Sequence, residues 1–229
     1  DADLTVTARS ITLTADSKSK VYDGTPLTAQ EVSMTGSLAE TDKFESEPQA
    51  TGSQTESGSS SNPVGTVRIV DKESGEDRTD NYKITPNPGT LTVTKAPAAQ
   101  NAVTIGSDSL VYDGQAHALK EASSLVTEGT TIYYATVQNP SKDDWSTEMP
   151  SFTNVGAHTI YVKAVNPNYE DAFANGTLTI TRRPVTISGN TGSFTYNGKE
   201  QTVDGFTAED PTDGRGLLKG HTVENVTAS

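Results

Sequence analysis

Short stretches in which apolar and polar residues alternate run along most of the chain. Residues 130–136 and 156–165 both alternate, and the second stretch places Ile160 and Val162 on one face and polar residues on the other. A period of two is typical of antiparallel strands with one face in solvent. Further strands of this kind are expected at residues 11–14, 103–105, 176–181 and 185–187. The pattern predicts an all-β chain.

The same pattern is compatible with two architectures, of which the first is favoured. Six or seven short strands per unit, separated by turn signals, predict tandem Ig-like antiparallel β-sandwich modules in an elongated array. The alternative is a β-grasp-like module with one short helix, which would use residues 118–125, the one stretch able to form a turn or two of helix. The Ser-rich residues 52–62 are expected to form a polar loop before a strand at Val64.

The chain also nearly repeats itself. Leu-Thr-Val-Thr at residues 4–7 returns at 91–94 and, as Leu-Thr-Ile-Thr, at 178–181, an offset of 87 residues each time (91 − 4 and 178 − 91). A Tyr-Asp/Asn-Gly marker recurs in the same order, and Asp or Asn before Gly favours a tight turn. The structural markers are Tyr22, Asp23, Gly24, Tyr112, Asp113, Gly114, Tyr196, Asn197 and Gly198, with Tyr82 and Tyr169 in a recurring Asn-Tyr pair.

These markers divide the chain. Residues 8–95 form the first repeat, 96–183 the second and 184–229 an incomplete third, while residues 1–7 match the closing strand of a preceding unit. Tandem arrays of this kind usually extend, display or bind. The third repeat lacks a closing strand, so its edges are expected to be exposed or to be completed by residues 1–7 of a neighbouring molecule.

Charge and composition exclude several functions. The net charge of −13, from 17 basic and 30 acidic residues, opposes binding to nucleic acid and adsorption to anionic membranes. The absence of cysteine excludes disulfides and thiolate metal sites. No stretch is apolar enough for direct membrane insertion.

No pattern points to catalysis. His117, His158 and His221 are accompanied by no nucleophile motif, and no phosphate or dinucleotide fingerprint is present. The acidic residues 71–77 lack the ligand spacing of a calcium loop and are expected to form a solvated hairpin loop. The sequence therefore predicts a protein that is not an enzyme and has no cofactor, metal or catalytic residue.

The strongest candidate for ligand binding surrounds the single tryptophan. Trp145 follows Asp143 and Asp144, and an exposed Trp beside carboxylates can stack on a sugar ring, whereas a buried one fills the core. The core interpretation is favoured for this residue. Tyr133 and Tyr161 complete the candidate set.

Residues 11–28, which contain the first Tyr-Asp-Gly marker, resemble the YDG and related MBG repeats of large Gram-positive bacterial surface proteins. Asn-Val-Gly at 154–156, Asn-Pro-Asn-Tyr at 166–169 and residues 176–181 fit the same type. The resemblance implies an extracellular, cell-wall-attached or secreted adhesin whose repeats form a stalk. The partners it implies are host glycans, mucins or host surface proteins, besides neighbouring repeats, with specificity in the divergent residues 33–62 and 120–152.

Overall fold

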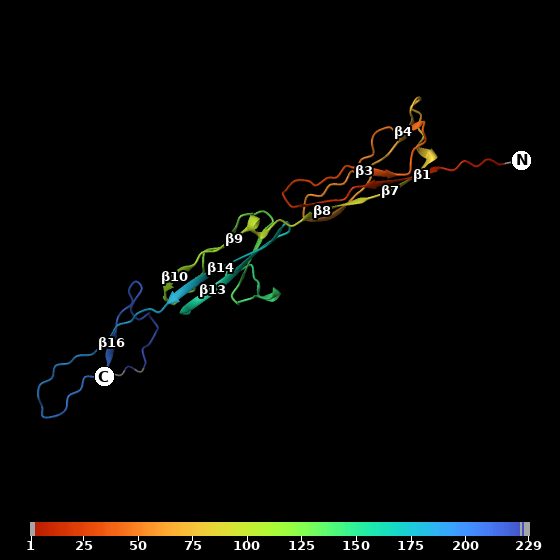
Figure 1. Cartoon of the computed structure of the whole chain (residues 1–229). Helices are drawn as coiled ribbons and strands as arrows, with labels where there is room; N and C mark the ends of the chain where they lie inside the picture. The colour runs from red at the N-terminus through yellow and green to blue at the C-terminus, as the bar shows by residue number, and fades with distance from the viewer. Residues whose placement is uncertain (1–2, 225, 227–229) are drawn as a thin grey trace. The chain divides into compact units, whose positions relative to one another are not determined.

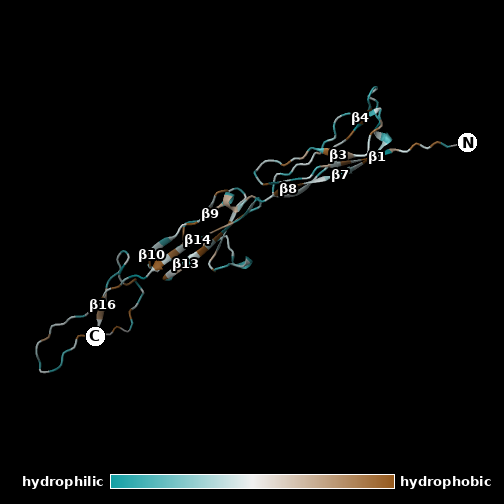
Figure 2. Cartoon of the chain, in the orientation of Figure 1, coloured by the Kyte–Doolittle hydropathy of each residue, from teal (hydrophilic) through white to brown (hydrophobic). Residues whose placement is uncertain are grey.

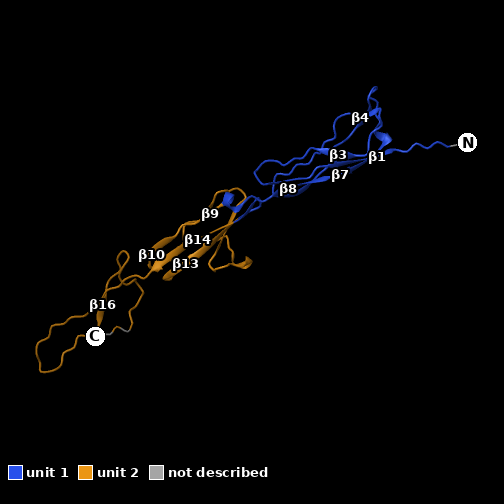
Figure 3. Cartoon of the chain, in the orientation of Figure 1, with its two compact units in different colours: residues 1–101, 165–171 blue, residues 102–164, 172–229 orange. Residues whose placement is uncertain are grey.

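A computed structural model describes residues 3–224 and 226, almost entirely as β-strands and loops (Figure 1). The chain forms two compact units, one of residues 1–101 with 165–171 and the other of residues 102–164 with 172–229 (Figure 3). Within the described residues, no helix has the length and apolar character needed to cross a membrane.

Three sheets build the first unit. They have the strand orders β3-β1-β7, β2-β8-β5 and β4-β6. The elements of this unit are β1 (Arg9–Ala15), β2 (Lys18–Val21), β3 (Val32–Thr35), β4 (Asp42–Phe44), β5 (Gly58–Asn62), β6 (Ile69–Asp71), β7 (Tyr82–Asn87), β8 (Gly89–Thr94) and the 3₁₀ turns η1 (Thr79–Asn81) and η2 (Ala98–Asn101).

The core of the first unit includes two apolar clusters. Ile11, Ile69 and Tyr82 pack together, and Leu27 packs with Leu91 and Val93. Strand β1 shows why its sequence alternates, because its residues 11, 13 and 15 are buried while those between them are partly exposed. Removing these apolar side chains from water is the main favourable term in folding.

Two strand pairs of the first unit are parallel, although the alternation predicts antiparallel sheets. Strand β1 pairs with β7, with Arg9 opposite Tyr82, and β2 pairs with β8, with Lys18 opposite Leu91. Parallel pairing requires a long crossover, and about 70 residues separate the members of each pair here. Alternation indicates which face of a strand is exposed to solvent. It does not indicate whether two strands far apart in the sequence pair in parallel or antiparallel direction.

The prediction of a polar loop over residues 52–62 is wrong in its second half. Strand β5 pairs antiparallel with β8, and Asn62 is fully buried at its end. The Asn62 amide donates to the carbonyls of Asp16 and Ala29 at 2.8 and 2.7 Å and accepts from the Gly52 amide at 2.9 Å. The Ser-rich segment thus forms a strand by pairing with the edge of β8, although it lacks an alternating apolar pattern. Val64 forms only an isolated bridge with Ala50.

The second unit contains a four-stranded sheet of order β10-β14-β13-β12 and the two-stranded pairs β9-β11 and β15-β16. Apolar colouring runs along β13 and β14 (Figure 2). The turn between these strands, at residues 165–171, belongs to the first compact unit. The elements are β9 (Val103–Thr104), β10 (Asp108–Val111), β11 (Ser123–Ser124), β12 (Thr131–Ala135), η3 (Lys142–Asp144), β13 (Gly156–Asn166), β14 (Tyr169–Thr181), β15 (Ile187–Gly189) and β16 (Phe206–Ala208).

The all-β class is confirmed, and the helical alternative is wrong. Residues 118–125 form no helix, since Leu119 and Ala122 are buried and β11 pairs antiparallel with β9. Sheet pairing and burial of these two apolar residues prevail over a weak helical propensity. The strand expected at residues 185–187 lies slightly later, as β15.

Candidate functional site

Each Tyr-Asp/Asn-Gly marker forms a turn held by its second residue. The Asp23 carboxylate accepts from the Thr25 amide at 2.9 Å, Asp113 from the Gln115 amide at 2.8 Å, and Asn197 from the Lys199 amide at 3.0 Å. The glycines that follow have φ of 78°, 80° and 75°, a left-handed conformation that favours glycine. The recurrence of the marker therefore has a local structural cause.

Hydrogen bonds to the aspartates of the first two turns lower the pKa of both carboxyl groups. Lys20 donates to Asp23 at 2.6 Å, which is the main cause there, followed by Thr25. The main cause at Asp113 is the His117 ring, whose Nε2 lies 2.8 Å from the carboxylate. Both carboxyl groups are at least partly exposed, and each is hydrogen-bonded by residues close to it in the chain.

The marker tyrosines have different surroundings. The Tyr22 ring packs edge-on against Tyr169 at 5.5 Å, and the Tyr112 ring lies 5.9 Å from His221. Tyr196 is 92% exposed. Tyr169 begins β14 directly after a turn, and Asn168 of that turn accepts from the Ser57 amide at 2.9 Å. The first two tyrosines thus serve packing, and the third projects into solvent.

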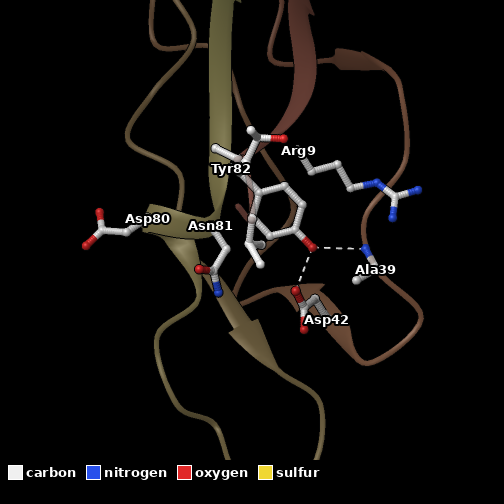
Figure 4. Close-up of a pocket in the computed structure, with 9 residues that line it drawn as sticks. Arg9, Ala39, Asp42, Asp80, Asn81 and Tyr82 are labelled. Carbon is white, nitrogen blue, oxygen red and sulfur yellow. Dashed lines mark hydrogen bonds between the residues drawn. The ribbon is translucent and has the colours of Figure 1, made fainter. Parts of the chain in front are cut away.

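Tyr82 lines a pocket of the first unit (Figure 4). Its hydroxyl donates to Asp42 at 2.5 Å and accepts from the Ala39 amide at 2.9 Å. Burial and the Asp42 carboxylate raise the pKa of this tyrosine. The pocket encloses about 390 Å³ and is also lined by Arg9, Asp80 and Asn81. The Tyr82 hydroxyl and the Asp42 carboxylate are thus hydrogen-bonded to each other. The main role of this contact is to connect β7 to β4.

The second unit presents an aromatic patch, which consists of Tyr133, Trp145, Lys163 and Phe173. The Lys163 ammonium lies 4.6 Å from the centre of the Trp145 ring and 5.4 Å from that of Tyr133. The Trp145 and Phe173 rings are 6.4 Å apart and inclined by 50°. The patch crosses the three adjacent strands β12, β13 and β14, with Trp145 contributed by the segment that follows η3.

Packing alone does not account for this patch, because Phe173 is 65% exposed while its neighbour Ala172 is buried. Trp145 is half-buried, so it neither fills the core nor stands free. Aromatic faces beside an ammonium group can stack on the apolar face of a sugar or contact a protein side chain. The arrangement is suited to binding.

The other predicted site residues have different positions. Asp143 is exposed. Asp144 accepts from the Ser141 hydroxyl at 2.6 Å and from the Ser141 amide at 2.7 Å, and these two hydrogen bonds, the first above all, lower the pKa of Asp144. Tyr161 shares the outward face of β13 with Lys163, two residues further along. Asp144 is thus occupied in stabilising its own turn.

Sequence reasoning missed Lys163 and Phe173. The alternation of β13 placed Lys163 on the polar face without indicating that Trp145 lies above it. Phe173 did carry a signal, as a large apolar residue at an outward position of a strand. Side-chain contacts across strands depend on register, which the alternation leaves open.

The acidic residues 71–77 form a loop that binds its own backbone. Asp71 accepts from the amides of Glu73 and Ser74 at 3.0 and 2.9 Å. Thr79 and then Arg68 lower the pKa of Asp77 to about 2. Across the described residues, no three acidic or histidine side chains gather in a way that could hold a metal ion.

No family model and no curated protein matches the chain. Among solved structures, immunoglobulin domains 1–4 of Sidekick-1 are 14% identical, with 78% of this chain and 52% of that one covered and a TM-score of 0.28. Domains EC1-2 of human mucin-like protocadherin are 10% identical (76% and 100% covered, TM-score 0.28). The zebrafish RET cadherin-like domains 1 to 4 are 15% identical (82% and 50% covered, TM-score 0.27). The chain spans about half the length of the Sidekick-1 structure.

Proposed function

We propose that this chain is a non-catalytic structural and display segment of an extracellular bacterial surface adhesin, in which its YDG/MBG-type repeats act as a stalk. The observation that carries the proposal is the recurrence of one strand register. Lys18 lies opposite Leu91 in the first repeat, and Asp108 lies opposite Leu178 in the second, both in parallel pairs. A module that is rebuilt along the chain suits extension and display.

Small-angle X-ray scattering on dilute, chromatographically monomeric protein tests the stalk role. The expected result is the pair-distance distribution of an elongated particle. The distribution of a compact globule would contradict the proposal. Attachment to the cell wall or secretion is a separate expectation, checked by localising the parent protein with an antibody against these repeats.

The aromatic patch supports a second candidate, in which the segment also binds a host glycan, a mucin or a host surface protein. Labelled protein applied to an array of mucin-type glycans is expected to give signals that weaken in Phe173→Ala and Trp145→Ala. Tyr196→Ala is the control, because it removes an exposed aromatic side chain outside the patch. A blank array, or signals equal in all variants, would remove the glycan version of this candidate.

A further inference from the structure

Main-chain pairing holds the aromatic patch of the second unit in place. All four of its residues belong to that unit, and three of them lie on the adjacent strands β12, β13 and β14. The fourth, Trp145, is followed by Ser146, which bridges to Tyr134 of β12 through two amide-to-carbonyl hydrogen bonds of 2.9 and 2.7 Å. The backbone that carries each ring and the ammonium group is therefore positioned before a ligand binds, which reduces the entropic cost of binding.

The Lys163 ammonium of the patch carries a positive charge that is not paired with a carboxylate. It lies over the rings of Trp145 and Tyr133, and among the described residues it takes part in no ion pair and no hydrogen bond. By contrast, Lys20 and Arg68 each pair with a carboxylate in this strongly acidic chain. An aromatic face attracts an ammonium group but has no lone pair, so the N–H groups remain able to donate to an anion.

The acidic turn before Trp145 does not supply that anion. Asp144, the residue next to Trp145, accepts from the hydroxyl and the amide of Ser141 at 2.6 and 2.7 Å. Its carboxylate is thus engaged within its own turn rather than with Lys163. The patch therefore combines exposed aromatic surface with a cation whose hydrogen-bond donors are unused.

We propose that the aromatic patch binds a sugar that carries a carboxylate or sulfate group. The inference rests on the glycan version of the second candidate function and names the class of glycan. Phe173, which is 65% exposed, offers a surface on which the apolar face of a sugar ring can stack, while the Lys163 ammonium donates to the anionic group. Hydrogen bonds between charged groups are about twice as strong as neutral ones, so the anionic group is expected to decide which sugars bind.

Two features favour a sugar over an extended acidic peptide. Strand β12 is an edge strand of its sheet, but Tyr134 is already bridged to Ser146, so a peptide that adds to this edge must displace that residue. The net charge of −13 repels an anion that relies on charge alone. A sugar gains from stacking as well as from its contact with Lys163, and it needs no main-chain pairing.

The fluorescence of Trp145 provides a test, because this residue is the single tryptophan of the chain and lies in the patch. The full chain is titrated with lactose, lactose sulfate and sialyllactose, which present the same disaccharide without an anion, with a sulfate or with a carboxylate. At least one anionic sugar is expected to change the emission and to bind about tenfold more tightly than lactose. The stronger of the two identifies the anionic group.

The outcomes separate this inference from the candidate function on which it rests. Equal affinities for all three sugars would overturn the inference and leave the glycan candidate standing. No response to any of them would overturn the inference, and a blank glycan array in addition would remove the glycan candidate itself.

Variants at Lys163 separate the charge from the stacking. Lys163→Gln should lower the affinity for the anionic sugar about tenfold, to that for lactose, whereas Lys163→Arg should keep most of it. The matched control is Lys120→Gln, which removes an exposed lysine of the same unit and changes the net charge equally. Circular dichroism checks that each variant is folded. Equal losses in Lys163→Gln and Lys120→Gln would overturn the inference. Binding of poly-L-glutamate that depends on Lys163, without binding of either anionic sugar, would overturn it in favour of an acidic protein partner.

Discussion

The first and third repeats contain the same turn in different surroundings. At Tyr22 the turn connects a strand paired with β8 to the buried Leu27. At Tyr196 the turn still forms, with the Asn197 amide oxygen bound to Lys199 and Gly198 at a φ of 75°, yet Tyr196 and Val203 are 92% and 41% exposed. A turn requires only its own few residues, whereas a strand and its core require a partner from far along the chain. Substitutions at matched positions can test this difference.

The largest effect is expected from the two leucines that occupy the same place in the Leu-Thr-Val-Thr motif. Leu91→Ala removes a side chain that is 0% exposed and should lower the free energy of unfolding by about 2–5 kcal/mol. Leu4→Ala, at a position 90% exposed, should change it by less than about 0.5 kcal/mol. Urea unfolding followed by circular dichroism measures both. Equal effects would show that residues 4–7 are already buried in solution.

A second contrast concerns two asparagines that each bind a distant carbonyl. Asn62 is buried and holds three backbone groups, so Asn62→Ala should cost about 1–3 kcal/mol by leaving those groups without partners. Asn190 donates to the Asp204 carbonyl at 3.1 Å in an exposed position. Asn190→Ala is the control and should be nearly silent. Hydrogen exchange at the Gly52 amide would reveal the loss at Asn62, and unchanged protection there would contradict this account.

The marker glycines give a smaller contrast. An alanine at position 24 meets no atom within 4 Å, so Gly24→Ala should cost only the backbone strain of a positive φ, about 1–2 kcal/mol. Gly198→Ala carries the same local strain, but the adjoining residues 192–195 lack a paired strand. It is therefore expected to leave cooperative unfolding unchanged. Comparable losses in urea unfolding would indicate that the third repeat unfolds together with the others.

The smallest effect is expected from Asp23→Asn, which gives the first turn the residue of the third. Asn keeps the hydrogen bond from the Thr25 amide but loses the ion pair with Lys20. Because the pKa of Asp23 is lowered on folding, its contribution is present above the ordinary value of 3.8 and is lost as the pH falls through the lower folded value. The free energy of unfolding of the variant should therefore fall less steeply than that of the wild type as the pH is lowered below 3.8. An unchanged slope in acid unfolding would count against the ion pair.

The same division between local and long-range structure explains what could be predicted. Alternation located β12 and β13, and Asp or Asn before Gly located the turns, because both signals lie within a few residues. The Ser-rich residues 58–62 gave no such signal, since they form a strand only because β8 offers an edge. The contact of Lys163 with Trp145 was missed for a similar reason. Trp145 reaches β13 from a loop whose path the sequence does not reveal.

The sequence by itself determined the repeat, its turns, the all-β class and the alternation of wet and dry faces, because these depend on neighbouring residues and on which side chains avoid water. Only the tertiary structure decided that β2 and β8 run parallel, that Asn62 is buried, and that the aromatic patch crosses three strands. Those features depend on hydrogen bonds and packing between segments tens of residues apart. The Leu and Val of an identical motif can therefore be buried at residues 91 and 93 and exposed at residues 4 and 6.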